Sequence, residues 1–598
     1  MAMSSLSKTT KFMLKGCWGI YIASFVFQFL MTVLTVFTSF LAKVLVDALS
    51  HELERAEFLE SWVIQFLSRG QGAEYIYQHM AILPVSVLIS ALVTVAISYF
   101  RFSLRANASS RINKQMQLVL FRHLEKLPFS VFKTEKSGDL IQTCTRDVDV
   151  LRQFLVMFLS QITYTIFIVV LCFSILFEIS WKLTLVSLAM FPIMFVYSFF
   201  LIKEVRNRFR KTDDSEAELV DAITQNLNGV RLVKAFNAET REIDRFERRL
   251  NHYSSAFRRE KRLSAFFFSS SDIFIFASRS VAIVYAIYLV FKGEITSGSV
   301  FVSYTFVNMM VWPLRNTATN LSRLGQTLAA TDRIQRLLDI VPEDLEEGES
   351  IQAQGNIEFR NVSFAYPDEP EKIVINDVSF RVPKGSTVAI MGKTGSGKST
   401  LFQLLTGLYQ PTKGSILLDD KDISTISLRS LRHNVVPVLQ DPFLFSKSIS
   451  ENIKIANKDA SDDDIRNAAR IASLDQAIES FSEGYDTAVG EKGVTLSGGQ
   501  KQRLAIARTV LSGAPVLLFD DSLSAVDAQT DLAIRRELKA LGSRCTTLII
   551  THRVSTAKDA DYIYVLEKGK IAEMGTNEEL LNGKGLYARV AEIQSAMR

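Results

Sequence analysis

Hydrophobic positions divide the chain into two parts of different character. Between Trp18 and about residue 320, uncharged apolar runs recur, each about as long as an α-helix that crosses the hydrocarbon core of a bilayer. From about residue 356 the apolar positions form short β-prone runs, separated by glycine, proline and amphipathic helical segments. The pattern predicts an α-helical membrane domain followed by a soluble α/β domain.

Six of the apolar runs are long enough to span a membrane, and buried helices of a soluble protein would not occur six in succession. Arg279 is the charged side chain inside the fifth run, where a cation is costly unless it faces water or a carboxylate. We therefore expect Arg279 to line a translocation path; packing between helices is the alternative. The six runs are Trp18–Ala42, Met80–Phe100, Phe154–Phe177, Leu183–Ile202, Ile273–Phe291 and Ile295–Leu314.

Lysine and arginine are unevenly distributed among the connections between these runs. The first connection, 51–78, holds two arginines against five glutamates, whereas nine lysines and arginines occur from Arg105 to Arg152. Basic connections stay on the cytoplasmic side of a membrane. The sequence therefore predicts a multi-pass protein of the cytoplasmic membrane with both termini in the cytoplasm.

The two basic connections are too long for structureless loops and carry apolar residues at helical spacing, so helices two to five are expected to continue beyond the membrane. Each extension is expected to turn once, at 127–139 and at 235–240, where proline, glycine or asparagine occurs. The turns are either solvated connectors or elbows that press on the soluble domain.

One stretch of the soluble half fits the phosphate-binding pattern G-x-x-x-x-G-K-[ST]. Glycines let successive backbone N–H groups surround a phosphate, the lysine supplies a positive charge, and the hydroxyl can ligate Mg²⁺. An apolar β-prone run precedes the stretch and a helix-like run follows it, so a nucleotide site is predicted. The stretch comprises Gly392, Lys393, Thr394, Gly395, Ser396, Gly397, Lys398, Ser399 and Thr400.

A charged segment around 343–349 separates the two halves. We assign residues 1–325 to a transmembrane domain of six helices, 326–354 to a linker and 355–598 to a nucleotide-binding domain.

The segment Leu496-Ser497-Gly498-Gly499-Gln500 follows the phosphate loop by about a hundred residues. With this segment the chain resembles the half-transporters of the ATP-binding cassette (ABC) exporters over essentially its full length. The resemblance implies ATP and Mg²⁺ as cofactors and a second half-transporter as partner. In that family each ATP lies between the P-loop of one chain and the signature of the other, so Leu496 to Gln500 would act in trans.

Five further positions match the family pattern residue by residue. Tyr366 is similar to the aromatic that stacks on adenine, although a tyrosine in a strand is more often a core residue. Gln440 resembles the Q-loop glutamine, and Asp520, after an apolar strand, resembles the Walker B aspartate. Asp527 matches the D-loop position, and His552 the switch histidine that contacts the γ-phosphate. The implied Mg²⁺ ligands are Ser399, Gln440 and Asp520.

The chain departs from the family at Asp521, where a glutamate normally follows the Walker B aspartate. That glutamate activates or positions the attacking water. A side chain one methylene shorter withdraws the carboxylate by about 1 Å, enough to cost on the order of 10²-fold in rate. We expect Asp521, His552 and Gln440 to form the catalytic group, with impaired hydrolysis, as in the degenerate-site subunit of a bacterial heterodimeric exporter. A homodimer that hydrolyses slowly is the alternative.

The two elbows look like the coupling helices of the family, with Phe132 and Phe236 as the candidate contacts. The resemblance implies ATP-driven export by alternating access. The substrate is expected to be hydrophobic or amphipathic (a drug, a lipid or a peptide), in contact with membrane lipid and with no nucleic-acid partner. An ATP-gated channel or regulator on the same scaffold is the second hypothesis, and a soluble ATPase fused to an anchor the third.

Overall fold

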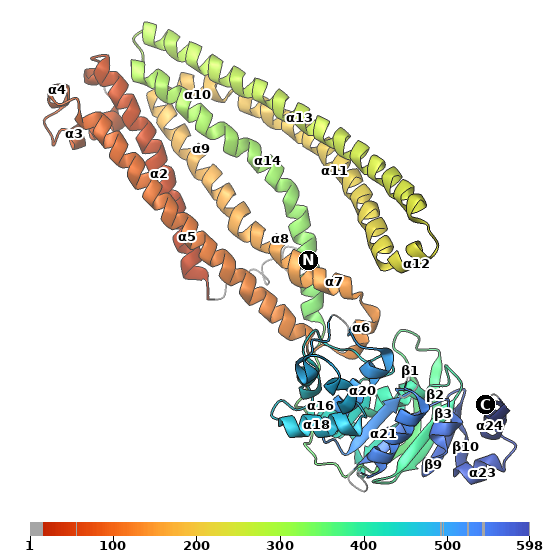
Figure 1. Ribbon diagram of the computed structural model, residues 1–598. Coiled ribbons are helices and arrows are strands. Elements are labelled where there is room, and N and C mark those ends of the chain that lie inside the picture. Colours follow the sequence, from red (N-terminus) through yellow and green to blue (C-terminus); the bar gives the residue numbers. More distant parts are fainter. Residues whose placement is uncertain are drawn as a thin grey trace. The chain divides into compact units, whose positions relative to one another are not determined.

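The computed structural model describes residues 16–596 apart from 56, 491–492, 494, 523–525 and 541–544, and describes no side-chain surroundings at some positions of 190–206 and at 314–323. The chain forms two compact units (Figure 1). The first, the helical unit, comprises the chain up to Leu124 and Gly138–Ile340. The second, the nucleotide unit, comprises Glu125–Ser137 and Val341–Arg598, so it includes the first elbow.

The helical unit consists of long helices joined by short connections. The connection between the first two long helices contains a 3₁₀ turn and two short helices. Two π-helical turns interrupt the third long helix. Its helices are α2 Trp18–Leu49, α3 Phe58–Leu67, α4 Ala73–Gln78, α5 Ile82–Leu124, α7 Ser137–Gln142, α8 Val148–Gln153, α9 Leu159–Ile179, α10 Trp181–Leu188, α11 Met190–Asn228, α12 Val230–Ala235, α13 Glu239–Phe291 and α14 Ser297–Asp339.

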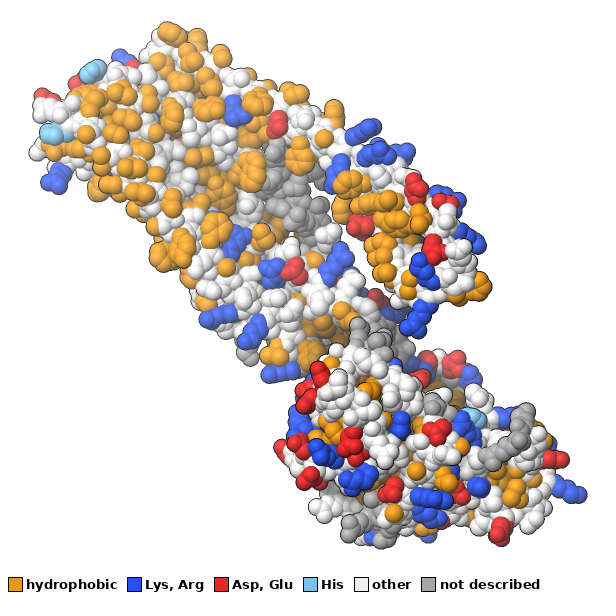
Figure 2. Space-filling view, viewed as in Figure 1, with side chains coloured by type: hydrophobic (Ala, Val, Ile, Leu, Met, Phe, Trp, Pro, Cys, Tyr) orange, Lys and Arg blue, Asp and Glu red, His pale blue; other side chains and the backbone are white. Residues whose placement is uncertain are grey.

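The prediction of an α-helical membrane domain is confirmed. Among the described residues, four helical stretches are long and apolar enough to cross a membrane, namely Trp18–Leu49, Ile82–Leu124, Ser137–Ile179 and Glu239–Phe291. They carry the first, second, third and fifth expected spans. The fourth falls on α10 and the start of α11, and the sixth on α14, which continues past Pro313. Figure 2 shows hydrophobic side chains covering the α2, α3 and α5 side of this unit.

A buried charged cluster joins α2, α3 and the start of α14. The Lys43 ammonium donates to Asp47 Oδ2 at 3.1 Å and also to Glu60, and all three side chains are fully buried. Asp47 further accepts from the Thr296 hydroxyl at 2.9 Å and from the Gly298 N–H at 2.6 Å. A Cβ on Gly298 would lie 2.4 Å from the Lys43 carbonyl oxygen, so glycine permits this close approach.

Helices α11 and α13 lie side by side over much of their length, and the short helix α12 joins their ends (Figure 1). The chain turns twice here, whereas one turn at 235–240 was expected. The first corner is at Gly229, where α11 ends. The second includes Asn237, whose φ of +49° is a left-handed conformation that asparagine tolerates.

The nucleotide unit is an α/β domain with two sheets. A four-stranded antiparallel sheet has the order β2-β1-β4-β5, and a six-stranded sheet has the order β10-β9-β3-β8-β7-β6. The strands are β1 Ile357–Ala365, β2 Ile373–Val382, β3 Thr387–Gly392, β4 Lys413–Leu418, β5 Lys421–Asp422, β6 Val435–Val438, β7 Val516–Asp520, β8 Thr546–Ile550, β9 Tyr562–Glu567 and β10 Lys570–Gly575.

Short helices cover the six-stranded sheet, and the short elbow helix α6, Phe129–Thr134, also belongs to this unit. The other helices are α15 Lys398–Leu405, α16 Leu428–Asn434, α17 Ile449–Lys454, α18 Asp462–Ile471, α19 Asp475–Glu479, α20 Gly498–Leu511, α21 Ala528–Ala540, α22 Val554–Ala557, α23 Asn577–Leu581 and α24 Leu586–Ala596.

The six-stranded sheet determines where the chemistry lies. Strands β3, β6, β7, β8 and β9 are parallel, and the central ones are buried along nearly their whole length. The carboxyl ends of parallel strands meet at one edge of a sheet, where ligands bind in α/β folds. The segments that follow β3, β6, β7 and β8 carry the predicted site residues.

Candidate functional site

The phosphate loop connects the carboxyl end of β3 to the start of α15. Gly392 has a φ of +154°, and a Cβ there would lie 2.3 Å from the Leu566 carbonyl oxygen, so only glycine fits beside β9. Gly397 caps α15 with a φ of +102°. The loop thus opens onto a helix N-terminus, whose free N–H groups attract an anion such as phosphate.

Lys398 folds back over its own loop. Its Nζ donates to the carbonyl oxygens of Gly392 and Lys393, both at 2.9 Å. Burial lowers the pKa of Lys398, and the carboxylates of Asp520 and Asp521 act in the opposite direction. The ammonium is therefore held at the loop mouth by neutral acceptors, which phosphate oxygens can replace.

Asp520 at the end of β7 faces the hydroxyl of Ser399, and the Ser399 Oγ donates to Asp520 Oδ1 at 3.0 Å. Burial raises the pKa of Asp520, while the Ser399 hydrogen bond and Lys398 lower it. A partly buried carboxylate beside a hydroxyl is a suitable donor set for Mg²⁺, which takes one or two carboxylates together with phosphate oxygens and water. Among the described residues no group of three or more His, Cys, Asp or Glu side chains is arranged for a metal ion.

Asp521 follows immediately and turns the chain away from β7. Its φ is +46°, a left-handed conformation that aspartate tolerates, and its N–H donates to the Ile550 carbonyl at 3.0 Å. Its carboxylate lies 3.2 Å from Nδ1 of His552. Burial raises the pKa of Asp521, and His552 and Arg553 oppose this effect. The backbone of His552 is held by Gln594, whose Nε2 donates to its carbonyl at 2.8 Å.

Tyr366 is fixed by its hydroxyl, which donates to Gln403 Oε1 at 2.9 Å and lies 2.9 Å from Thr400 Oγ1. One face of its ring is covered by Lys133 of the elbow helix α6, whose Nζ is 3.6 Å from the ring centroid. The same ammonium lies 3.6 Å from Asp368 Oδ2. An aromatic face that attracts a cation also offers a surface for a stacked base.

These elements enclose a cavity of about 600 Å³. An adjoining cavity of about 500 Å³ reaches Lys393 and helix α24. The larger cavity gathers nearly all the predicted nucleotide residues of this chain, together with Lys133. Those lining it are Tyr366, Gly392, Thr394, Gly395, Gly397, Lys398, Ser399, Thr400, Gln440, Asp520, Asp521 and His552.

The signature segment lies outside this cavity. Ser497 caps helix α20, and its side chain and that of Gln500 bond each other's backbone N–H groups at 3.3 and 2.8 Å. Asp527 directly precedes helix α21, and its Oδ1 accepts a hydrogen bond from the Thr530 N–H at 3.0 Å. Hydrogen bonds from Thr530 lower the pKa of Asp527. Both segments are structured without contributing to this chain's own cavity.

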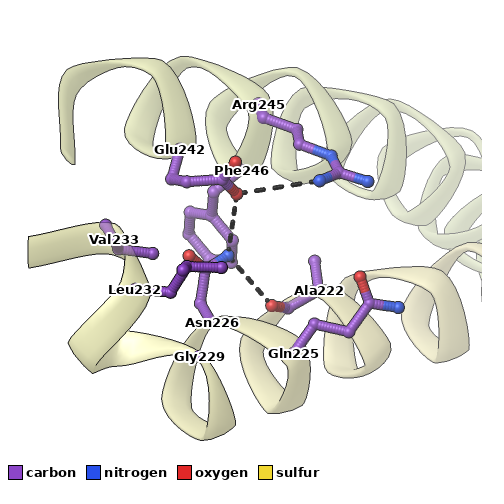
Figure 3. Close-up of a pocket in the computed structure, with 9 residues that line it drawn as sticks. All are labelled: Ala222, Gln225, Asn226, Gly229, Leu232, Val233, Glu242, Arg245 and Phe246. Atoms are coloured by element: carbon purple, nitrogen blue, oxygen red, sulfur yellow. Dashed lines mark hydrogen bonds and ion pairs between the residues drawn. The ribbon is translucent and has the colours of Figure 1, made fainter. Parts of the chain in front are cut away.

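The candidate coupling residues lie on separate units. Phe132 on α6 is 41% exposed and Phe236 beside α12 is 75% exposed, an unusual exposure for phenylalanine. The α12 corner is braced by Asn226, which donates to Glu242 Oε2 at 3.1 Å, while Arg245 lies 3.8 Å from the same oxygen (Figure 3). Side-chain contacts therefore connect α11 to α13 at this corner, which presents an apolar side chain.

Arg279 is not paired with a carboxylate among the described residues. Its Nη1 donates to Asn308 Oδ1 at 3.1 Å, and its guanidinium lies 4.8 Å from the Phe276 ring and 5.8 Å from the Tyr304 ring. Its Nε is buried without an acceptor. The side chain thus joins α13 to α14 through polar and cation–π contacts.

Two features were not expected from the sequence. Lys133 in the nucleotide cavity depends on where the elbow folds, and no sequence signal marks it. The cluster of Lys43, Asp47 and Glu60 lies just beyond the first uncharged run. The i, i+4 spacing of Lys43 and Asp47 was the available signal for a pair on α2.

Both units are similar to known protein families. A family model described as the ABC transporter transmembrane region matches residues 21–314, and one described as ABC transporter matches residues 375–524. A bacterial Atm1-family ABC exporter solved with ATP bound superimposes with a TM-score of 0.79 at 26% identity, covering 97% of this chain and 98% of that one.

Two curated proteins are similar over most of their length. An ATP-dependent lipid A-core flippase of Haemophilus influenzae is 34% identical, with 88% of this chain and 89% of the flippase aligned. A Bacillus subtilis ATP-binding/permease protein named for multidrug export is 32% identical, with 90% of this chain and 93% of that protein aligned.

Proposed function

The chain belongs to the ABC transporters and is an ATP-driven exporter of the multidrug and lipid type, and from that premise we propose that it exports a hydrophobic or amphipathic compound by alternating access. It works as one half of a dimer in the cytoplasmic membrane. The nucleotide unit and both termini lie on the cytoplasmic side, where ATP is available and where the basic connections belong.

We propose further that the partner is a different half-transporter and that this chain supplies the degenerate ATP site. The observation that supports this is the position of Asp521, whose shortened carboxylate lies against His552. The signature at Ser497 is intact and capped, yet lies away from this chain's own cavity. In a sandwich dimer it is available to the partner's ATP.

The residues of this chain divide the work at its own site. Tyr366 stacks the base, Lys398 and the loop N–H groups hold the phosphates, and Ser399, Gln440 and Asp520 hold Mg²⁺, which when bound neutralises phosphate charge. His552 contacts the γ-phosphate. Asp521 positions water poorly, because its carboxylate is too short and is engaged with His552. Binding is preserved and turnover is slow.

The elbows transmit closure of the nucleotide units to the helices. Phe132 and Phe236 are exposed apolar side chains on short helices, a form that suits docking into a groove. The brace formed by Asn226, Glu242 and Arg245 keeps the α12 corner stiff, so that a displacement of the docked end moves α11 and α13 together (Figure 3).

Arg279 lines the translocation path and favours neutral or anionic substrates. Its single amide partner, Asn308, leaves the charge uncompensated, and a cation at membrane depth requires water or an anion. A cysteine at position 279 should react with a water-soluble thiol reagent in one nucleotide state and be protected in the other. Inaccessibility in both states would refute this role.

Transport itself is tested in vesicles that contain the purified chain with its partner half-transporter. Addition of ATP should drive accumulation of a fluorescent amphipathic compound against its gradient, and Lys398→Ala in this chain combined with the same change in the partner should abolish it. An ATP-gated channel would instead give passive conductance that dissipates the gradient. That outcome would overturn export.

A further inference from the structure

A group of polar side chains lies between α2, α5 and α9, at the end of the apolar stretch of α5. The Arg101 Nη1 donates to Gln28 Oε1 at 2.6 Å, and the Arg101 guanidinium also lies 4.3 Å from the Phe102 ring. Gln28 is only 3% exposed. This contact joins α2 to α5 through one hydrogen bond and leaves most of the donors of both side chains unused.

Three of the unused donors are buried without an acceptor. They are Gln28 Nε2, Arg101 Nε and Gln161 Nε2. A buried donor without a partner costs free energy, and native structures contain few of them. Among the described residues of α2, α5 and α9, these donors are the buried side-chain atoms without a partner, which indicates that the missing partner is an acceptor.

Gln161 lies on α9 about one turn before Tyr164, which is within electrostatic range of Arg101. On one side of Gln161, the Leu155 carbonyl accepts from the Tyr21 hydroxyl at 2.6 Å. On the other side, the Phe167 ring is 5.0 Å from the Phe29 ring. The three donors therefore come from three neighbouring helices.

The charged side chains of the group, Arg101 and Arg105, are both positive. Arg105 follows Arg101 by one helical turn and lies within electrostatic range of Arg101 and of Tyr21. Among the described residues neither arginine is paired with a carboxylate. Like charges one turn apart repel each other, more strongly where water is scarce. An anion between them would remove this repulsion.

The depth of the group in the membrane matches that of a lipid headgroup. Residues 82–100 of α5 carry no charge, and 19 residues of helix span about 28 Å, close to the thickness of a bilayer core. Arg101 is the first charged residue after this stretch. It therefore lies at the boundary where headgroups meet the hydrocarbon region.

We infer that Gln28, Arg101, Arg105 and Gln161 form an anionic-headgroup site, which binds the phosphate or carboxylate of an amphipathic, lipid-like substrate. The site deepens the proposed export function and rests on it, because it names the class of substrate. The arginines supply charge-assisted hydrogen bonds and the two amides supply the remaining donors. The acyl part of the ligand lies along the apolar faces next to the site.

Binding is measured without ATP, by native mass spectrometry of the full-length chain in a neutral detergent. The probes are phosphatidic acid, diacylglycerol with the same acyl chains, and inorganic phosphate. Phosphatidic acid should bind at least about tenfold more tightly than diacylglycerol, and millimolar phosphate should not displace it. Equal binding of the two lipids, or displacement by phosphate alone, would overturn the site.

Arg101→Gln should weaken phosphatidic acid binding by roughly tenfold or more and leave diacylglycerol binding unchanged. Arg111→Gln is the matched control, an exposed arginine on the same helix, and should bind like the wild type. Gln28→Leu keeps the side-chain size and should weaken binding severalfold, so it tests the site if Arg101→Gln fails to fold. Unchanged phosphatidic acid binding in Gln28→Leu or in folded Arg101→Gln would overturn the site.

The same variants in vesicles separate this inference from export. ATP-driven transport of phosphatidic acid with an unchanged KM in Arg101→Gln would overturn the site and leave export standing. Headgroup binding that depends on Arg101, with no uphill transport by the wild type, would support the site and overturn export.

Discussion

The carboxylate of Asp521 lies 3.2 Å from Nδ1 of His552, so the side chain at the expected position of the catalytic base contacts the predicted switch histidine. Asp521 is held from both sides, because its N–H also donates to Ile550 at 3.0 Å and its φ of +46° leaves little freedom to move. The carboxylate therefore cannot move toward a water molecule in the cavity without breaking its contact with His552.

Asp521→Glu should raise hydrolysis at this chain's own site. The extra methylene moves the carboxylate outward by about 1 Å, and restored placement of water is worth up to on the order of 10²-fold. The measurement is the ATPase rate per site in a complex whose partner base has been removed. Asp520→Glu is the control, because it lengthens the neighbouring carboxylate that faces Ser399, and it should give no gain. An unchanged rate in Asp521→Glu would show that side-chain length does not limit this site.

Lys398→Ala should lower ATP affinity by about 10 to 100-fold, because charge-assisted hydrogen bonds to the phosphates are lost. Lys413→Ala is the matched control. It removes an exposed lysine of β4 that lines neither of the two cavities. Equilibrium binding of a fluorescent ATP analogue in the presence of Mg²⁺ distinguishes the two variants. Equal effects would contradict the geometry of the loop.

Lys133→Ala should raise ATP affinity by about two- to fivefold, because the ammonium covers the Tyr366 face on which we propose that adenine stacks. Lys136→Ala removes an exposed lysine from the same elbow and should have no effect. The readout is the Kd for ATP at low ionic strength, repeated at high salt, where the difference should shrink. Lower affinity in Lys133→Ala would mean that the lysine assists the nucleotide.

Asp47→Ala should destabilise the helical unit by several kcal/mol, since it leaves Thr296 and the Gly298 N–H unpaired beside the buried Lys43. Glu60→Gln should change the free energy of unfolding by only about 1 kcal/mol. Lys43 still donates to Asp47 and can donate to the amide oxygen of the new side chain. Thermal unfolding in detergent ranks the two variants. The reverse ranking would contradict the hydrogen-bond pattern.

The same cluster predicts a pH dependence. Burial raises the pKa of Glu60 to about 7, although Lys43 acts against it. A carboxyl whose pKa is higher in the folded state favours folding at low pH, and this contribution is lost as pH rises from the ordinary glutamate pKa of 4.5 to about 7. The wild type should lose stability relative to Glu60→Gln between these two pH values. Parallel curves for the two proteins would refute the shift.

The predicted nucleotide residues lie together because a parallel sheet brings them to one edge. Asp520 ends β7, His552 follows β8 and the phosphate loop follows β3, so one edge of one sheet unites segments far apart in the chain. The local signals were strong at each of these points, since each is an apolar strand followed by a polar residue.

The contacts that the sequence did not reveal depend on tertiary packing. Lys133 reaches Tyr366 only because the elbow folds against the nucleotide unit, and periodicity gives no distance between such segments. The α12 corner begins at Gly229, six residues before the expected turn at 235–240, where Asn226 near the end of α11 donates to Glu242 of α13. Arg101 follows an uncharged run and resembled an ordinary helix-end charge.

The central claim is that this chain's P-loop binds ATP while the partner's base drives turnover, and it is tested by ATPase rates of the reconstituted complex. Removal of the partner's Walker B glutamate should nearly abolish turnover, and Ser497→Arg should be similarly severe, because it obstructs the partner's ATP. Asp521→Ala should cost much less, since this site already hydrolyses slowly. If Asp521→Ala instead stops turnover as completely as removal of the partner's glutamate, both sites hydrolyse ATP and the claim is wrong.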